Sequence, residues 1–212
     1  MKRFKFLRTG YKSEYGNQTW KLGKWYTFDG ELYMCNAGFH CSKGIYQAFS
    51  FVQGKYLAEV EVKGKHLSET DKECWEKMRV VKVWKWTKKD SVAFAIYSAS
   101  LVLKIYEDKY PNDDRPRKAI EAAQTWLKNP TEKNRVAAWA AGDAAGAAWA
   151  AAGDAAWAAR AAAGDVAGAA WAARAALAAA WAAGDAAWAA LYKKLDKWMV
   201  SHLKEMKLVK EI

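Results

Sequence analysis

Short runs of apolar and aromatic residues, separated by polar turns, occupy the first ninety positions of the chain. Residues 24–28 and 31–35 flank Asp29-Gly30, a pair that favours a hairpin turn between two strands. Residues 56–63 and 79–86 alternate apolar and polar side chains, which is typical of half-exposed strands. With one short helix expected between the second and third of these runs, the pattern predicts a compact antiparallel sheet.

Beyond residue 87 the apolar residues take the spacing of helices. Residues 91–110 have the length and apolar density of a buried helix that ends before a proline. Asp114 can cap the next helix, with Pro116 in its first turn. The last apolar positions predict an amphipathic helix with a lysine-rich outer face.

Residues 137–190 contain 34 alanines, interrupted by tryptophans and by four Gly-Asp pairs, the first three of which are spaced 11 residues apart. Alanine is the strongest helix former, and its single methyl group lets helices pack closely. Each Gly-Asp pair can end one helix and cap the next, or it can lie inside a longer helix. Because helices of about nine residues are marginal alone, we expect two to four longer helices.

These patterns together predict an α+β protein in two domains. Residues 1–87 are expected to form a small antiparallel-sheet domain. Residues 88–212 are expected to form an all-α helical bundle rich in alanine and tryptophan. Alanine helices with many tryptophans offer little surface that repels a second copy, so we expect a homo-oligomer.

The chain carries a net charge of +11, with basic residues concentrated in its first ninety positions and its C-terminal tail. Such an excess favours anionic partners, although scattered lysines also serve solubility alone. Three cysteines, an odd number, fit a reducing compartment. No apolar segment follows the start, and charged residues interrupt the alanine block, so we expect a cytoplasmic protein that does not bind membranes.

The large and charged residues of the helical half form the expected ligand site. Arg115 and Arg117 stand at a helix start, where backbone N–H groups favour an anion, and guanidinium groups bind phosphate bidentately. Alternatively, these arginines pair with aspartates of the Gly-Asp repeat. Tryptophans above a floor of methyl groups can stack on a nucleobase, fill the core or form an oligomer interface. The predicted ligand-binding residues are Arg115, Arg117, Glu121, Trp139, Asp143, Trp149, Asp154, Trp157, Arg160, Asp165 and Arg174.

Cysteines and histidines gather in the first half of the chain. Cys35, His40 and Cys41, with His66 and Cys74 further on, allow a zinc site. The paired C-x2-C spacing of structural zinc sites is absent, however, so we predict no metal.

His40 is also a candidate catalytic residue. It resembles the nucleotide-pocket histidine of ADP-ribosyltransferase-like folds, and its candidate partners are Tyr46 or Tyr56 and Glu59 or Glu61. The sequence has no Ser-His-Asp order, phosphate-binding loop or dinucleotide glycine fingerprint. We therefore predict no catalytic residue and no cofactor.

Two segments carry family resemblances. Asp114-Arg115-Pro116-Arg117-Lys118-Ala119-Ile120-Glu121 and the alanine-rich helices after it resemble the immunity-protein (Imm-5-like) helical domain of bacteria and phages, over residues 111–202. The N-terminal half resembles a small uncharacterised domain common in phage proteins, through Gly23-x-x-Tyr26, Met34-Cys35-x-x-Gly38-Phe39-His40 and Ala58-Glu59-Val60-Glu61. Neither resemblance implies a known reaction. Together they imply a conflict between phage and bacterium, with toxin neutralisation or interference with host defence.

Three functional hypotheses follow. The first is a phage-type anti-defence protein that sequesters a small nucleotide-type immune signal without catalysis, in the host cytoplasm. The second is an immunity or inhibitor protein that binds a toxin or a host defence protein directly, through a basic face with exposed aromatics at Trp20, Trp25, Trp84 and Trp86. The third is an ADP-ribosyltransferase-like enzyme centred on His40. Nucleic-acid binding would rest on charge alone, and we do not expect it.

Overall fold

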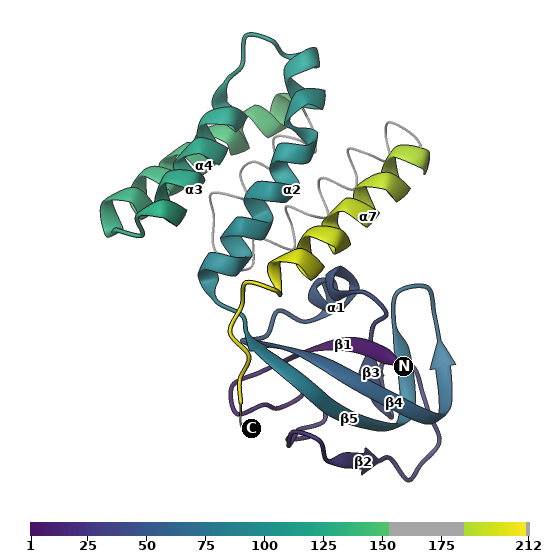
Figure 1. Cartoon of the computed structure of the whole chain (residues 1–212). Helices are drawn as coiled ribbons and strands as arrows, with labels where there is room; N and C mark the ends of the chain where they lie inside the picture. Colours follow the sequence, from purple (N-terminus) through teal and green to yellow (C-terminus); the bar gives the residue numbers. More distant parts are fainter. Residues whose placement is uncertain (153–184, 211–212) are drawn as a thin grey trace. The chain divides into compact units, whose positions relative to one another are not determined.

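The computed structural model describes residues 1–152 and 185–210, with side-chain surroundings for residues 1–145 and 190–210. Contacts divide the chain into two compact units. The first comprises Met1–Trp86 with Asp196–Ile212, and the second comprises Thr87–Leu195. An antiparallel sheet precedes a series of helices (Figure 1), so the predicted α+β fold class is confirmed.

The first unit contains five strands of one antiparallel sheet and one short helix (Figure 1). Strands β4 and β5 form a long hairpin, β1 pairs with β4, and both β2 and β3 pair with β5. The elements are β1 (Lys2–Leu7), β2 (Trp25–Thr27), β3 (Phe39–Cys41), α1 (Ile45–Phe51), β4 (Tyr56–Ser68) and β5 (Glu73–Lys85).

A further bridge joins the end of β3 to β1. Phe4 and Ser42 exchange two backbone N–H···O bonds of 2.9 Å each. The strand path β1–β4–β5–β3 therefore returns to β1, although Phe4 and Ser42 lie far apart in the sequence.

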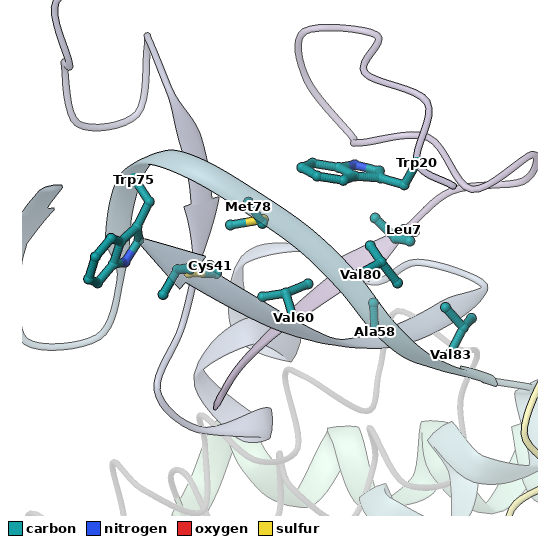
Figure 2. Packing of buried hydrophobic residues seen from close by; sticks show 10 residues of the cluster. Leu7, Trp20, Cys41, Ala58, Val60, Trp75, Met78, Val80 and Val83 are labelled. Atoms are coloured by element: carbon teal, nitrogen blue, oxygen red, sulfur yellow. The ribbon is translucent and has the colours of Figure 1, made fainter. Parts of the chain in front are cut away.

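One face of the sheet carries the buried cluster of Figure 2, built from β1, β3, β4, β5 and the loop before β2. Trp20 is the more deeply buried of its two tryptophans and is 1% exposed. The indole N–H of Trp20 donates to Ser13 Oγ over 2.9 Å, and its ring meets those of Tyr26 and Phe39 edge-on, with centroids 5.2 Å apart. The hydrogen bond compensates the polar atom that burial of an indole brings into the core.

A second aromatic group holds α1 against the sheet. The rings of Phe6, Phe49 and Trp86 lie 5.3–5.5 Å apart, from β1, α1 and the end of β5. Both Trp84 and Trp86 are buried. The prediction that Trp20, Trp84 and Trp86 are exposed is therefore wrong, because these large apolar rings fill the two cores of the first unit.

Two local predictions about strands also need correction. Residues 31–35 form no strand, because β2 pairs with Lys77–Arg79 of β5 rather than across the Asp29-Gly30 turn. In β5 the alternation changes at Val81, which is an extra residue in the pairing with β4. This β-bulge places both Val80 and Val83 in the core.

The second unit is helical (Figure 1). Thr87 and Asp90 form a reciprocal capping box at the start of the first helix. The buried residues of α3 and α4, which contact each other, are mostly small. The helices are α2 (Lys88–Lys109), α3 (Arg115–Lys128), α4 (Glu132–Ala152) and α7 (Asp185–His202), of which α7 contributes residues to both units.

The described part of the alanine block shows, for one Gly-Asp pair, whether the pair ends a helix. Gly142-Asp143 lies inside the continuous helix α4, so this pair does not end a helix. Asp185 is the first residue of α7. The two remaining pairs, with the expected helix boundaries between residues 153 and 184, lie outside the described residues. None of the described helices combines the length and apolarity that a membrane span requires.

Candidate functional site

A recess of about 480 Å³ opens in the first unit, where β1 and β3 meet beside the end of α1. Its lining comes from β1, the loops 13–18 and 35–38, β3, α1 and Lys72. Recesses of this size commonly hold small molecules in proteins. Its position follows from the Phe4–Ser42 bridge, which brings the lining elements together.

Lys5 is partly exposed and projects from β1 on the side of the buried cluster. Its register partner is Ala58, which belongs to that cluster, and Leu7 two positions further on belongs to it as well. The Lys5 ammonium donates to the backbone carbonyl of His40 over 2.9 Å. Among the described residues, no carboxylate forms an ion pair with Lys5. An ammonium has three donors, so this cation lines the recess with its charge uncompensated.

Burial lowers the pKa of Lys5, with the neighbouring thiols of Cys41 and Cys74 acting in the opposite direction. Both thiols stay protonated at neutral pH, because burial raises the pKa of Cys41 to about 12 and that of Cys74 to about 11. Neither thiol therefore supplies a counter-charge for Lys5 at neutral pH.

Arg3, on the same face of β1, has a different environment. Its guanidinium donates to both carboxylate oxygens of the buried Glu73, and the Trp75 indole N–H donates to Glu73 over 2.8 Å. Burial acts to raise the pKa of Glu73, but the hydrogen bonds from Arg3 and Trp75 outweigh it and hold the pKa below its ordinary value. The Arg3–Glu73 pair is thus compensated internally.

His40 fixes the loop that forms one wall of the recess. Its Nε2 accepts from the backbone N–H of Cys35 over 2.8 Å, so that nitrogen carries no proton. Burial and the nearby Lys5 charge lower the pKa of His40, which keeps the ring neutral. The same loop needs left-handed backbone at Cys35, with φ of 65°, and at Gly38, with φ of 111°. His40 is therefore a positioning residue.

The carboxylates offered as partners of His40 have other contacts. Glu59 pairs with Lys2 and Lys82 at 3.4 and 3.7 Å, and Glu61 pairs with Arg79. In the part of the chain that is described, no group of three or more His, Cys, Asp or Glu side chains could hold a metal ion.

Aromatic side chains surround the opening of the recess. Tyr15 is 82% exposed and Phe51 is 46% exposed, and both line it. The Lys72 ammonium lies 5.3 Å from the centroid of the Phe51 ring and pairs with Glu69 at 3.1 Å. Deeper in the lining, the rings of Phe28 and Phe39 meet edge-on. The lining thus combines aromatic rings with the cations of Lys5 and Lys72 and with the carboxylate of Glu14, which pairs with Arg8.

The predicted arginines of the second unit bind carboxylates instead. Arg115 Nε and Nη2 donate to Asp113 over 2.8 and 2.6 Å, and Tyr106 donates to the same carboxylate over 2.6 Å. Arg117 donates to both oxygens of Glu107 over 2.7 Å each. The partners are thus local carboxylates, and no contact with Asp143 is among them. An open hollow of about 530 Å³ over residues 109–115 includes Arg115, whose guanidinium is already bound.

The other predicted ligand residues divide between exposed positions and undescribed ones. Glu121 on α3, and Trp139 and Asp143 on α4, are exposed, Trp139 to 46%. The side chain of Trp149 has no described surroundings. Five more predicted residues lie outside the described part of the chain, namely Asp154, Trp157, Arg160, Asp165 and Arg174.

The sequence prediction missed Lys5. In Lys-Arg-Phe-Lys-Phe-Leu, residues 2–7, Lys5 shares its parity with both Arg3 and Leu7, so this strand face does not stand out as apolar and the sequence carries no clear signal for Lys5.

Comparison with known proteins gives one match, to a family model, and it covers the part of the chain that contains the recess. Residues 1–90 match the model of a domain family of unknown function, DUF7666. No curated protein and no solved structure matches the chain. The matched segment contains every residue that lines the recess, from Phe4 to Lys72. The resemblances to the immunity-protein helical domain and to a phage-associated domain stay predictions.

Proposed function

We propose that this protein binds a small anionic ligand of the nucleotide type in the recess of its first unit and sequesters it without turnover. The observation that carries the proposal is Lys5, a cation on the core side of a strand that donates to a carbonyl and has no carboxylate partner among the described residues. Burying a charge is costly unless an opposite charge compensates it. A bound anion supplies that compensation.

The remaining lining supports a ligand that also carries an aromatic group. Phe28, Phe39, Phe51 and Tyr15 offer ring faces and edges along the recess. Stacking of a base on an aromatic side chain is worth roughly 1–3 kcal/mol. A nucleotide joins an anion to an aromatic base, as this combination requires.

The candidate catalytic groups near the recess already have partners, which favours sequestration of the ligand over catalysis. The Nε2 of His40 is engaged by the Cys35 backbone, and Glu59 and Glu61 are held in ion pairs. General acid–base catalysis needs a titratable group within reach of the reacting proton. Tight binding without turnover needs only complementarity.

We place this activity in the conflict between phages and bacteria, as the resemblances imply. The ligand would then be a nucleotide signal made by a host defence system, and the protein would act in the host cytoplasm. Self-association of the helical half would multiply the number of sites per particle. The site differs from the one predicted in the helices, because Arg115 and Arg117 are neutralised by Asp113 and Glu107.

Calorimetric titration of the full chain tests the proposal. The panel contains nucleoside monophosphates, ADP-ribose-type nucleotides and cyclic nucleotides, and chromatography examines the ligand after binding. We expect saturable binding of at least one compound, recovered unchanged. Silence across the panel would overturn the proposal, and a chemically altered ligand would replace sequestration by an enzymatic function. Direct capture of a toxin or defence protein by a chain that binds no nucleotide would favour the second hypothesis.

A further inference from the structure

Two neighbouring cations of β1, Arg3 and Lys5, have different partners in the first unit. Arg3 meets the carboxylate of Glu73, whereas Lys5, two residues along the same strand face, meets only the carbonyl of His40. Ser42, whose backbone bridges to Phe4, lines the recess with Lys5. Because paired residues share a face and Phe4 and Lys5 alternate along β1, the Ser42 side chain lies on the opposite face of β1 from the Lys5 ammonium.

A second lining cation, Lys72, already forms an ion pair. Lys72 pairs with Glu69 at 3.1 Å and lies over the Phe51 ring. Lys5 is consequently the lining cation that has no carboxylate partner among the described residues. One uncompensated interior cation fits one anionic group.

We propose that the ligand class is the nucleoside monophosphate, with its phosphate on Lys5 and its base toward Tyr15. This assignment rests on the proposed function and specifies the ligand of the same recess. A cyclic dinucleotide carries two bases and two phosphates, so its second phosphate would find no further lining cation without a carboxylate partner among the described residues. A free nucleoside would leave Lys5 uncompensated.

The charge state of Lys5 adds a pH signature. The titratable and charged groups around it are His40 and Cys41 of β3, Cys74 and Glu73 of β5, and Arg3 of its own strand, and the same recess is lined by Glu14, Cys35 and Lys72. His40 is neutral, the Cys41 and Cys74 thiols are protonated, and the Arg3–Glu73 pair keeps its charges between pH 7.5 and 10. Burial lowers the pKa of Lys5 below the ordinary 10.5. Affinity for a phosphate should therefore fall as the pH rises, beginning at a lower pH than for an exposed lysine.

The test uses calorimetry on the full chain with the four common nucleoside monophosphates, their nucleosides, inorganic phosphate and a cyclic dinucleotide. Lys5→Met is the main variant, and Lys5→Arg keeps the charge. Lys2→Met is the matched control, because Lys2 lies on the same strand with its side chain 70% exposed. We expect Lys5→Met to weaken monophosphate binding about a hundredfold, Lys5→Arg to retain most of it, and Lys2→Met to change it less than threefold.

The outcomes separate the two proposals. If no nucleotide binds, the proposed function fails and the ligand assignment fails with it. If a monophosphate binds equally well to wild type and Lys5→Met, or if a nucleoside or cyclic dinucleotide binds as tightly as the monophosphate, only the ligand assignment is overturned. Should Lys5→Met not fold, a pH-independent affinity of the wild type between pH 7.5 and 10 overturns the role of Lys5, and a decline supports it.

Discussion

The recess of the first unit and the α2–α3 corner of the second both present cations near aromatic rings, but their charges are handled differently. Arg115 and Arg117 each hold a carboxylate with two N–H groups, so little charge remains for a ligand. Lys5 holds one carbonyl oxygen. The comparison teaches that a residue's charge indicates a ligand site only after its partners are known.

Sequence distance explains why the two regions differ in predictability. Arg115 lies two residues from Asp113, and Arg117 lies ten residues from Glu107 across one turn, so their pairing is a local property. The recess instead needs Phe4 to meet Ser42. No periodicity in a single segment encodes that contact.

The largest expected effect concerns the buried cluster of the first unit. Trp20→Ala should lower the free energy of unfolding by about 3–5 kcal/mol, because it empties a buried ring position and orphans Ser13. Trp139→Ala, at a half-exposed position of α4, should change it by less than about 0.5 kcal/mol. Urea denaturation followed by tryptophan fluorescence and circular dichroism measures both. Similar losses for the two variants would remove the distinction between the buried cluster and the exposed helix face.

A somewhat smaller effect is expected from the compensated pair beside Lys5. Glu73→Gln leaves Arg3 without its counter-charge and should cost about 3 kcal/mol, whereas Glu107→Gln, in the more exposed pair with Arg117, should cost less than about 1 kcal/mol. The folded-state pKa of Glu73 lies below the ordinary 4.5. The ionised Glu73 therefore contributes its full stabilisation to the folded state above pH 4.5. That contribution to the free energy of unfolding is lost as the pH falls below 4.5.

Denaturation curves of wild type and Glu73→Gln between pH 3 and pH 7 check this dependence. The difference between the two proteins should shrink as the pH falls below 4.5. A difference that grows on acidification would contradict the assigned charge state.

The smallest effect is expected at the α2–α3 corner. Tyr106→Phe removes the 2.6 Å hydrogen bond to Asp113 and should cost about 1 kcal/mol of unfolding free energy. Burial and this hydrogen bond raise the pKa of Tyr106 to about 12. Burial also raises the pKa values of Tyr11 and Tyr97. Absorbance titration of the phenols should therefore show several late-titrating groups, of which Tyr106→Phe removes one, and an unchanged titration would show that the corner is not assembled as described.

Much of the fold could be predicted from the sequence. The alternation of residues 56–63 and 79–86 predicts parts of β4 and β5, and Asp114 with Pro116 predicts the start of α3. Strand β1 was missed because its six residues place charges on both parities, which hides the apolar alternation. Its pairing with β4 over a long sequence separation decides its conformation.

The candidate site was less predictable than the fold. Arginine, aspartate and tryptophan stand out against alanine, so composition directs attention to the helical half. The recess lies in the less conspicuous half, and its cation is one lysine among many. The distinguishing property of Lys5 is its missing carboxylate, which only the pairing of β1, β3, β4 and β5 reveals.

The central claim is that Lys5 lowers the stability of the folded protein when the recess is empty and contributes to ligand binding when it is occupied. Thermal melting of wild type, Lys5→Met and Lys2→Met, each with and without a nucleoside monophosphate, measures both sides of it. Without ligand, Lys5→Met should melt above wild type, because replacing a buried charge by an apolar chain removes its desolvation penalty. At a hundredfold excess of ligand over Kd, wild type and Lys2→Met should gain about 2.7 kcal/mol of stability, and Lys5→Met should gain almost nothing. A Lys5→Met protein that melts below wild type and is stabilised equally by the ligand would contradict the claim.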